Sequence, residues 1–211
     1  MNRQVQRAGT WSALTLFAVG VLYAVVLIFG IATTGLRDPI GGWVLDVMET
    51  LTLLSAPLIV ILFSAIHTSA APEAKVFTLA AFAFAASAGA LTAAVHFVGL
   101  TALQQLGRQG ISWPSELYAI ELLAWDLFLG LALISASPAF AASDRTLHHL
   151  LLATGGLCVL GGAGPLLGLM PLQFIGVLCY GALLPITAFL LARRFRSGLL
   201  AHDGASRTVG R

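Results

Sequence analysis

Six long apolar segments dominate the amino-acid sequence and leave only short polar connections between them. A helix rises about 1.5 Å per residue, so about 20 apolar residues are enough to cross the roughly 30 Å hydrocarbon core of a bilayer. The segments lie at positions 10–33, 43–66, 75–101, 115–140, 147–168 and 171–193. We therefore expect an all-α integral membrane protein in which six transmembrane helices form a compact bundle.

The composition excludes a soluble fold. Of the 211 residues, 58% are hydrophobic and only 9% are charged, whereas about 25% of the residues in a soluble domain are charged. The apolar runs are continuous, which argues against the alternating strands of an outer-membrane barrel. We expect residues 1–196 to form one transmembrane domain and the polar segment 197–211 to be a mobile cytoplasmic tail.

The basic residues predict the orientation of the bundle. With a cytoplasmic N-terminus, the outer loops contain only Arg37 and Arg108. The inner segments then contain Arg3, Arg7, Lys75, Arg145, Arg193, Arg194, Arg196, Arg207 and Arg211. This positive-inside bias predicts a multi-pass protein of the cell (plasma or inner) membrane with both termini in the cytoplasm. In hydropathy and size the chain resembles small six-span proteins of bacterial inner membranes, a resemblance that carries no motif.

Three ionisable residues are predicted to share one layer in the outer half of the membrane. By the helical rise, Glu49, His96 and Glu121 each lie about 6 to 10 Å below the outer boundary. His96 continues a stripe of small residues along 81–99, a pattern that lets helices approach closely in a bilayer. The imidazole should therefore face a neighbouring helix, with Glu49 or Glu121 as its partner.

The fourth segment carries the deepest acid. At about 100° per residue, Asp126 is about 140° from Glu121 around the helix, whereas Tyr118 and Trp125 share the Glu121 face. An ionisable group in hydrocarbon is costly and is by default a functional hypothesis. The candidate ligand- or proton-binding residues are Asp46, Glu49, Thr92, His96, Tyr118, Glu121, Trp125 and Asp126.

Other features carry simpler expectations. Cys158 and Cys179 are interpreted as small buried residues, and the sequence has no metal-type spacing of Cys and His, no cofactor motif and no nucleic-acid-binding pattern. SAPLIV around Pro57 resembles AGPLLG around Pro165, and paired Gly/Pro interruptions in equivalent inverted positions are typical of transport sites. The alternative to a transport site is that the glycines and prolines of these segments only provide close helix packing and an ordinary proline kink.

The sequence is compatible with three different functions. In the first, the outer-half pocket binds a lipophilic or cationic small molecule and couples its binding or transport to protons, which favours a homodimer for so small a protein. In the second, the same residues catalyse acid/base chemistry on a lipid or isoprenoid, although no catalytic residue is assigned. In the third, the chain is a structural or accessory subunit whose polar groups hold helices together. Membrane lipids are partners in all three.

Overall fold

The computed structural model describes residues 2–35, 40–107, 111 and 113–198. Within these ranges the chain is helical and contains no strand. Six helices are long and apolar enough to cross a membrane: Arg3–Thr34, Gly42–Ser69, Pro72–Leu103, Glu116–Phe140, Arg145–Leu166 and Met170–Ser197. The expected helical class and the number of long helices are therefore confirmed. Nearly all of the tail, from residue 199 on, lies outside the described residues.

The first, second and fifth long helices are single α-helices, and the other three are composite. The uninterrupted helices are α1 (Arg3–Thr34), α2 (Gly42–Ser69) and α6 (Arg145–Leu166). The third helix consists of η1 (Pro72–Ala74), α3 (Lys75–Val98) and η2 (Gly99–Leu103). The fourth consists of α4 (Glu116–Leu122), η3 (Leu123–Leu129), α5 (Gly130–Ala136) and η4 (Ser137–Phe140). The sixth consists of η5 (Met170–Leu172), α7 (Gln173–Leu178), η6 (Cys179–Leu183) and α8 (Leu184–Ser197).

Local capping sets several helix ends. Ser115 accepts a hydrogen bond from the backbone N–H of Tyr118, and Asp144 accepts one from the N–H of Leu147, so each satisfies a donor that the first helical turn leaves free. Gly198 ends α8 with a positive φ of 70°, a conformation that glycine adopts without steric cost. The Ser115 cap matters for the site because it sets the start of the helix that carries Glu121.

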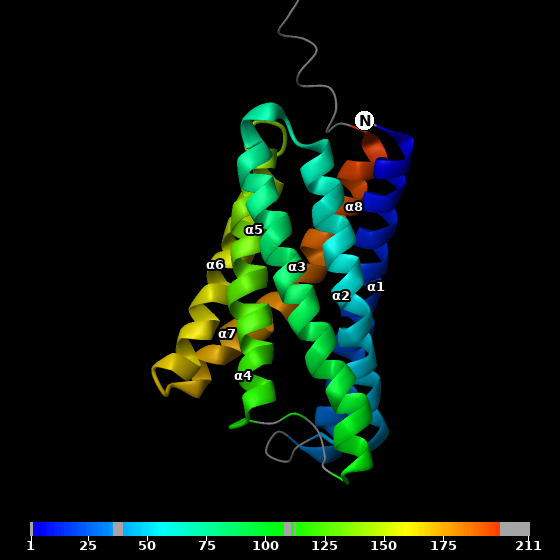
Figure 1. The fold of residues 1–211 in the computed structure, drawn as a ribbon, viewed down its shortest axis with the longest axis vertical. Coiled ribbons are helices and arrows are strands. Elements are labelled where there is room, and N and C mark those ends of the chain that lie inside the picture. Colours follow the sequence, from blue (N-terminus) through cyan, green and yellow to red (C-terminus); the bar gives the residue numbers. More distant parts are fainter. Residues whose placement is uncertain (1, 36–39, 108–110, 112, 199–211) are drawn as a thin grey trace, which may run out of the picture.

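The six long helices form a ring in which each packs against its neighbours in sequence. α1 contacts both α2 and α8, α2 contacts α3, and α3 packs along η3 and α5. α6 then packs against α5 and α7 and closes the ring through η6 and α8. Figure 1 shows the start of α1 and the end of α8 at one end of the bundle, and the starts of α2 and α4 and the end of α6 at the other. We call the half that contains the N-terminus the terminal half and the opposite one the far half.

The two halves differ in packing. The terminal half is filled by large side chains that are almost completely buried, among them Phe63, Phe140 and Phe195. The ring of Phe195 occupies the space beside Gly9, where a Cβ atom would lie only 2.6 Å from it. In the far half, all of the long helices except α6 line a cavity. The interior is therefore dense at one end and hollow toward the other.

Three π-helical segments interrupt the long helices, and regular helical angles did not predict them. They are η2, η3 and η6. π-helix is well under 1% of protein structure and is found frequently at functional sites. Here η3 and η6 carry residues that line the cavity, and η2 begins at the glycine against which the Glu49 carboxyl lies.

The two prolines compared in the sequence occupy different places in their helices. Pro57 lies in the middle of α2, whereas Pro165 lies in the last turn of α6. The two prolines therefore lie at different distances from the ends of their helices.

Candidate functional site

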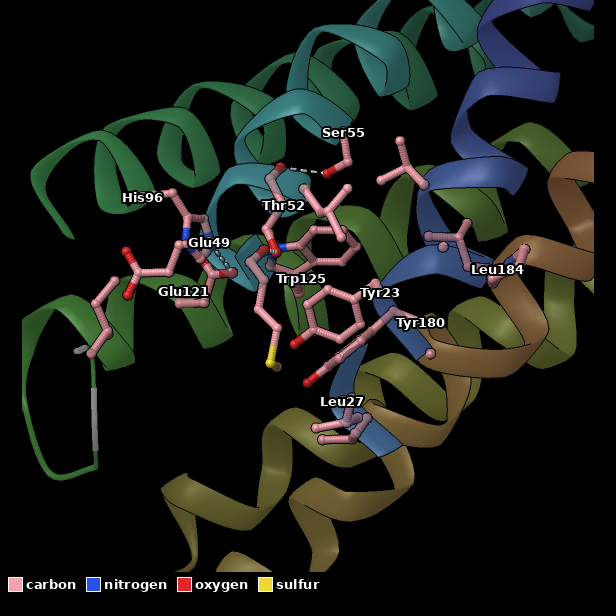
Figure 2. Close-up of a pocket in the computed structure, with 18 of the residues that line it drawn as sticks. Tyr23, Leu27, Glu49, Thr52, Ser55, His96, Glu121, Trp125, Tyr180 and Leu184 are labelled. Carbon is pink, nitrogen blue, oxygen red and sulfur yellow. Dashed lines mark hydrogen bonds and ion pairs between the residues drawn. The ribbon is translucent and has the colours of Figure 1, made fainter. Parts of the chain in front are cut away.

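A cavity of about 340 Å³ lies in the far half of the ring. Five of the six long helices contribute to its wall, and α6 is the one that does not. Most of the wall is apolar, with ionisable groups gathered where α2, α3 and α4 meet (Figure 2). A largely apolar cavity with a few convergent polar groups is the usual form of a small-molecule site, and this volume lies within the range of such sites, about 300 to 1,000 Å³.

The central polar contact joins α3 to α4. His96 Nε2 lies 2.8 Å from Glu121 Oε1, and the two side chains are only 9% and 18% exposed. With the carboxylate as acceptor, Nε2 carries the proton that is shared across this contact. Both residues line the cavity. Of the two partners that the sequence offered for His96, the structure selects Glu121.

Glu49 belongs to the same wall but is positioned by a glycine. It extends from α2, is buried, and lines the cavity. One of its carboxyl oxygens occupies the space beside Gly99, where a Cβ atom would collide with it. Gly99 is the first residue of η2. The absence of a side chain at this position therefore makes room for the Glu49 carboxyl next to the His96–Glu121 pair.

Four aromatic residues from three of the long helices also line the cavity: Tyr23, Tyr118, Trp125 and Tyr180. The rings of Trp125 and Tyr180 lie with their centroids 5.3 Å apart in a tilted arrangement. Gln173 Nε2 donates a hydrogen bond to the Tyr180 hydroxyl at 2.8 Å, which holds that ring from the α7 side. Figure 2 shows Tyr23, Trp125 and Tyr180 together, with His96, Glu49 and Glu121 beyond them.

Several polar atoms of the residues that line the cavity have no hydrogen-bond partner in the described part of the chain. Among the described residues, His96 Nδ1, Glu121 Oε2 and Trp125 Nε1 are buried and have no hydrogen-bond partner. Buried polar atoms in proteins nearly always have one. All three belong to residues that line the cavity, but the three atoms themselves are covered by neighbouring protein atoms.

Asp126 lies outside this wall. Its side chain is fully buried, and its two oxygens have no hydrogen-bond partner among the described residues. It packs into a gap formed by glycines: a Cβ atom at Gly162 would lie 2.9 Å from the Asp126 Cβ, and one at Gly176 would collide with its carboxyl. Asp126 therefore faces α6 and α7, while its neighbour Trp125 faces the cavity.

The remaining candidates stand apart from the cavity. Asp46 is exposed and accepts a hydrogen bond from Gln104 Nε2 at 2.8 Å, which ties α2 to the end of the third helix. Thr92 is buried on α3, one turn from His96, and does not line the cavity. Glu116, at the start of α4, is exposed. Within the described residues, no three His, Cys, Asp or Glu side chains are arranged to hold a metal ion.

Sequence reasoning missed Tyr23 and Tyr180. Each lies in a long apolar segment, where a single tyrosine carries no charge or periodicity that would single it out. They reach the cavity because α1 packs directly against α8 and η6, and this contact closes the ring. Knowledge of which helices lie side by side in the bundle would have been needed to identify these two tyrosines.

A scan of protein-family models, a search of curated proteins and a search of solved structures each found no match to this chain.

Proposed function

We propose that this chain is a multi-pass protein of the cell membrane that binds a small lipophilic or cationic molecule in the far-half cavity and couples its binding or transport to proton exchange. The far half is the outer half of the membrane, and both termini are cytoplasmic, as the distribution of Lys and Arg predicts. The observation that carries the proposal is an apolar cavity of about 340 Å³ whose wall contains a hydrogen-bonded His–Glu pair.

The His96–Glu121 contact supports proton exchange because its two partners can redistribute one proton. Intramembrane His and acidic residues are typical of proton paths. His96 Nδ1 and Glu121 Oε2 are buried without a hydrogen-bond partner among the described residues, so each partner of the pair keeps the capacity for a further hydrogen bond. A ligand that contacts this pair would therefore alter its proton affinity, and by linkage the pH would alter ligand binding.

The test uses Glu121→Gln and Glu116→Gln as a matched pair on one helix. Glu121 lines the cavity, whereas Glu116 is exposed five positions earlier. In purified protein, Glu121→Gln should abolish the pH dependence of ligand binding, and Glu116→Gln should preserve it. In proteoliposomes, an imposed pH gradient should drive uptake by the wild type but not by Glu121→Gln. A pH dependence that survives Glu121→Gln would contradict the proposed coupling.

One observation also favours an intramembrane enzyme. A histidine oriented by a carboxylate, whose second ring nitrogen has no partner among the described residues, has the arrangement of a general base and its orienting group. The substrate would be a lipid or isoprenoid held by the apolar wall. Turnover by the purified protein in detergent, lost in His96→Gln, would favour this alternative. If neither ligand binding nor turnover occurs and the variants only lose stability, the polar groups are structural.

A further inference from the structure

The charged groups of the cavity wall are acidic with the exception of His96. Glu49 and Glu121 both line the cavity, and the described residues of the wall include no lysine or arginine. His96 is already engaged by Glu121 through Nε2. With a protonated imidazole and two ionised carboxyls, the polar end carries a net negative charge. This end would attract a cation and repel an anion.

The aromatic residues match the same kind of ligand. The faces of Trp and Tyr attract a cation placed within about 6 Å of the ring centroid, and recognition of quaternary ammonium groups commonly uses several such rings. Tyr23, Tyr118, Trp125 and Tyr180 line the cavity together with the acids. An organic ammonium group has a weakly hydrated surface that suits aromatic contacts. A small metal ion would instead require several converging oxygen ligands.

The wall becomes apolar toward the middle of the bundle. Along α2 the lining runs from Leu45 to Ser55, and Ser55 lies about 9 Å of helical rise beyond Glu49 toward the middle of the bundle. At that deeper level α1 and α8 contribute Leu16, Val19, Leu184 and Pro185. A molecule that fills the cavity therefore meets carboxylates at one end and aliphatic side chains at the other.

We propose that the ligand is an amphiphilic organic cation, with one ammonium group at Glu49, Glu121 and the aromatic rings and an apolar body that extends toward Leu184. This inference rests on the proposed function, which places a ligand in this cavity, and it specifies the chemical class. The two carboxylates have different roles. Glu121 links the ligand to the proton on His96, whereas Glu49, positioned by Gly99, contributes negative charge directly to the ammonium group.

The experiment compares three probes that share a phenylbutyl body and differ in the head group. These are trimethyl(phenylbutyl)ammonium, its uncharged analogue with a tert-butyl group in place of the trimethylammonium, and phenylbutanesulfonate. Binding to the full chain, purified in a neutral detergent, is measured by titration calorimetry. A permanent charge on the ammonium probe removes any contribution from its own protonation.

The ammonium probe should bind at least about tenfold more tightly than the uncharged analogue, and the sulfonate should show no binding. Glu49→Gln and Glu121→Gln should each weaken ammonium binding about tenfold and change the affinity for the uncharged analogue by less than about threefold. Glu116→Gln should alter neither affinity. Size-exclusion chromatography and circular dichroism verify that each variant is folded.

Two results would overturn the inference. The first leaves ligand binding in the cavity intact, and the second refutes it as well. Equal affinity for the ammonium and uncharged probes, unaffected by Glu49→Gln, would refute a cationic ligand while the cavity remained a binding site. No binding of either probe to the wild type would refute both the ligand class and ligand binding in the cavity.

Discussion

His96 and Glu121 are 25 residues apart in the sequence, and their side chains meet at 2.8 Å between Nε2 and Oε1. The contact joins the last turn of α3 to α4. It lies in the wall of the cavity, so it holds together two helices that enclose the site and presents a shared proton to whatever occupies it. Stability and ligand binding should therefore both respond to its removal.

A double-mutant cycle on this pair should give a favourable coupling. His96→Gln and Glu121→Gln are combined, and the free energy of unfolding is measured in detergent for the single variants and the double variant. The coupling energy should be about 0.6 kcal/mol and at most about 1.7 kcal/mol, the average and the maximum measured for interhelical hydrogen bonds in a membrane bundle. Strictly additive effects of the two substitutions would mean that the contact contributes no stability.

Gly99→Ala should destabilise the protein because the new methyl group would collide with the Glu49 carboxyl. Overpacking of this kind typically costs about 1 to 3 kcal/mol. Shortening the acid in the Gly99→Ala/Glu49→Ala double variant should restore part of the loss in an unfolding assay. Gly156→Ala is the control, since no heavy atom lies within 4 Å of the Cβ it would add. Equal losses in Gly99→Ala and Gly156→Ala would contradict this packing.

Trp125 should report ligand binding by its fluorescence. Of the four tryptophans, Trp125 lines the cavity, whereas Trp11, Trp43 and Trp113 are exposed. Saturation with the ammonium probe should change the tryptophan emission of the wild type and of Trp11→Phe. The change should disappear in Trp125→Phe, which also loses the ring best suited to a cation. A signal that persists in Trp125→Phe would place the ligand elsewhere.

Asp126→Asn should separate binding from transport. Asp126 does not line the cavity, so the affinity for the ammonium probe should change by less than about threefold. The substitution keeps the size of the side chain and removes its exchangeable proton, so proton-driven uptake into proteoliposomes should fall sharply if Asp126 takes part in proton transfer. Loss of binding together with uptake would instead show that the aspartate supports the shape of the cavity.

Thiol labelling in intact cells should test the orientation. Glu116 and Glu73 are both exposed but lie at opposite ends of the bundle. With cytoplasmic termini, a membrane-impermeant reagent should label Glu116→Cys and leave Glu73→Cys unlabelled until the cells are lysed. The native Cys158 and Cys179 are buried and should contribute little background. The reverse pattern would invert the predicted topology.

Part of the site could be anticipated by counting residues. The helical rise is nearly constant, so depth along a helix follows from sequence position, and this placed Glu49, His96 and Glu121 in one layer. Which acid would meet His96 could not be deduced in this way. Two carboxylates at equal depth differ only in lateral position, and the packing of α3 between α2 and α4 determines that position.

The π-helical segments show a different limit. The sequence 123–129 has no proline or glycine that would mark a departure from the α-helix, yet it forms η3. The fit of neighbouring helices determines such departures, and here they accompany Trp125 on the cavity side and Asp126 on the α6 and α7 side. An angle of about 100° per residue no longer describes the helix through this segment.

The amino-acid sequence by itself determined that the chain forms six long apolar helices, and it determined the position of each ionisable residue along them. These are local properties, because an apolar helix satisfies its own backbone hydrogen bonds and rises by a constant amount per residue. The tertiary structure alone decided that the helices close into a ring, that His96 meets Glu121, and that Tyr23 and Tyr180 complete the wall. Those outcomes depend on which side chains and glycines allow neighbouring helices to approach, and that is a property of pairs of segments far apart in the chain.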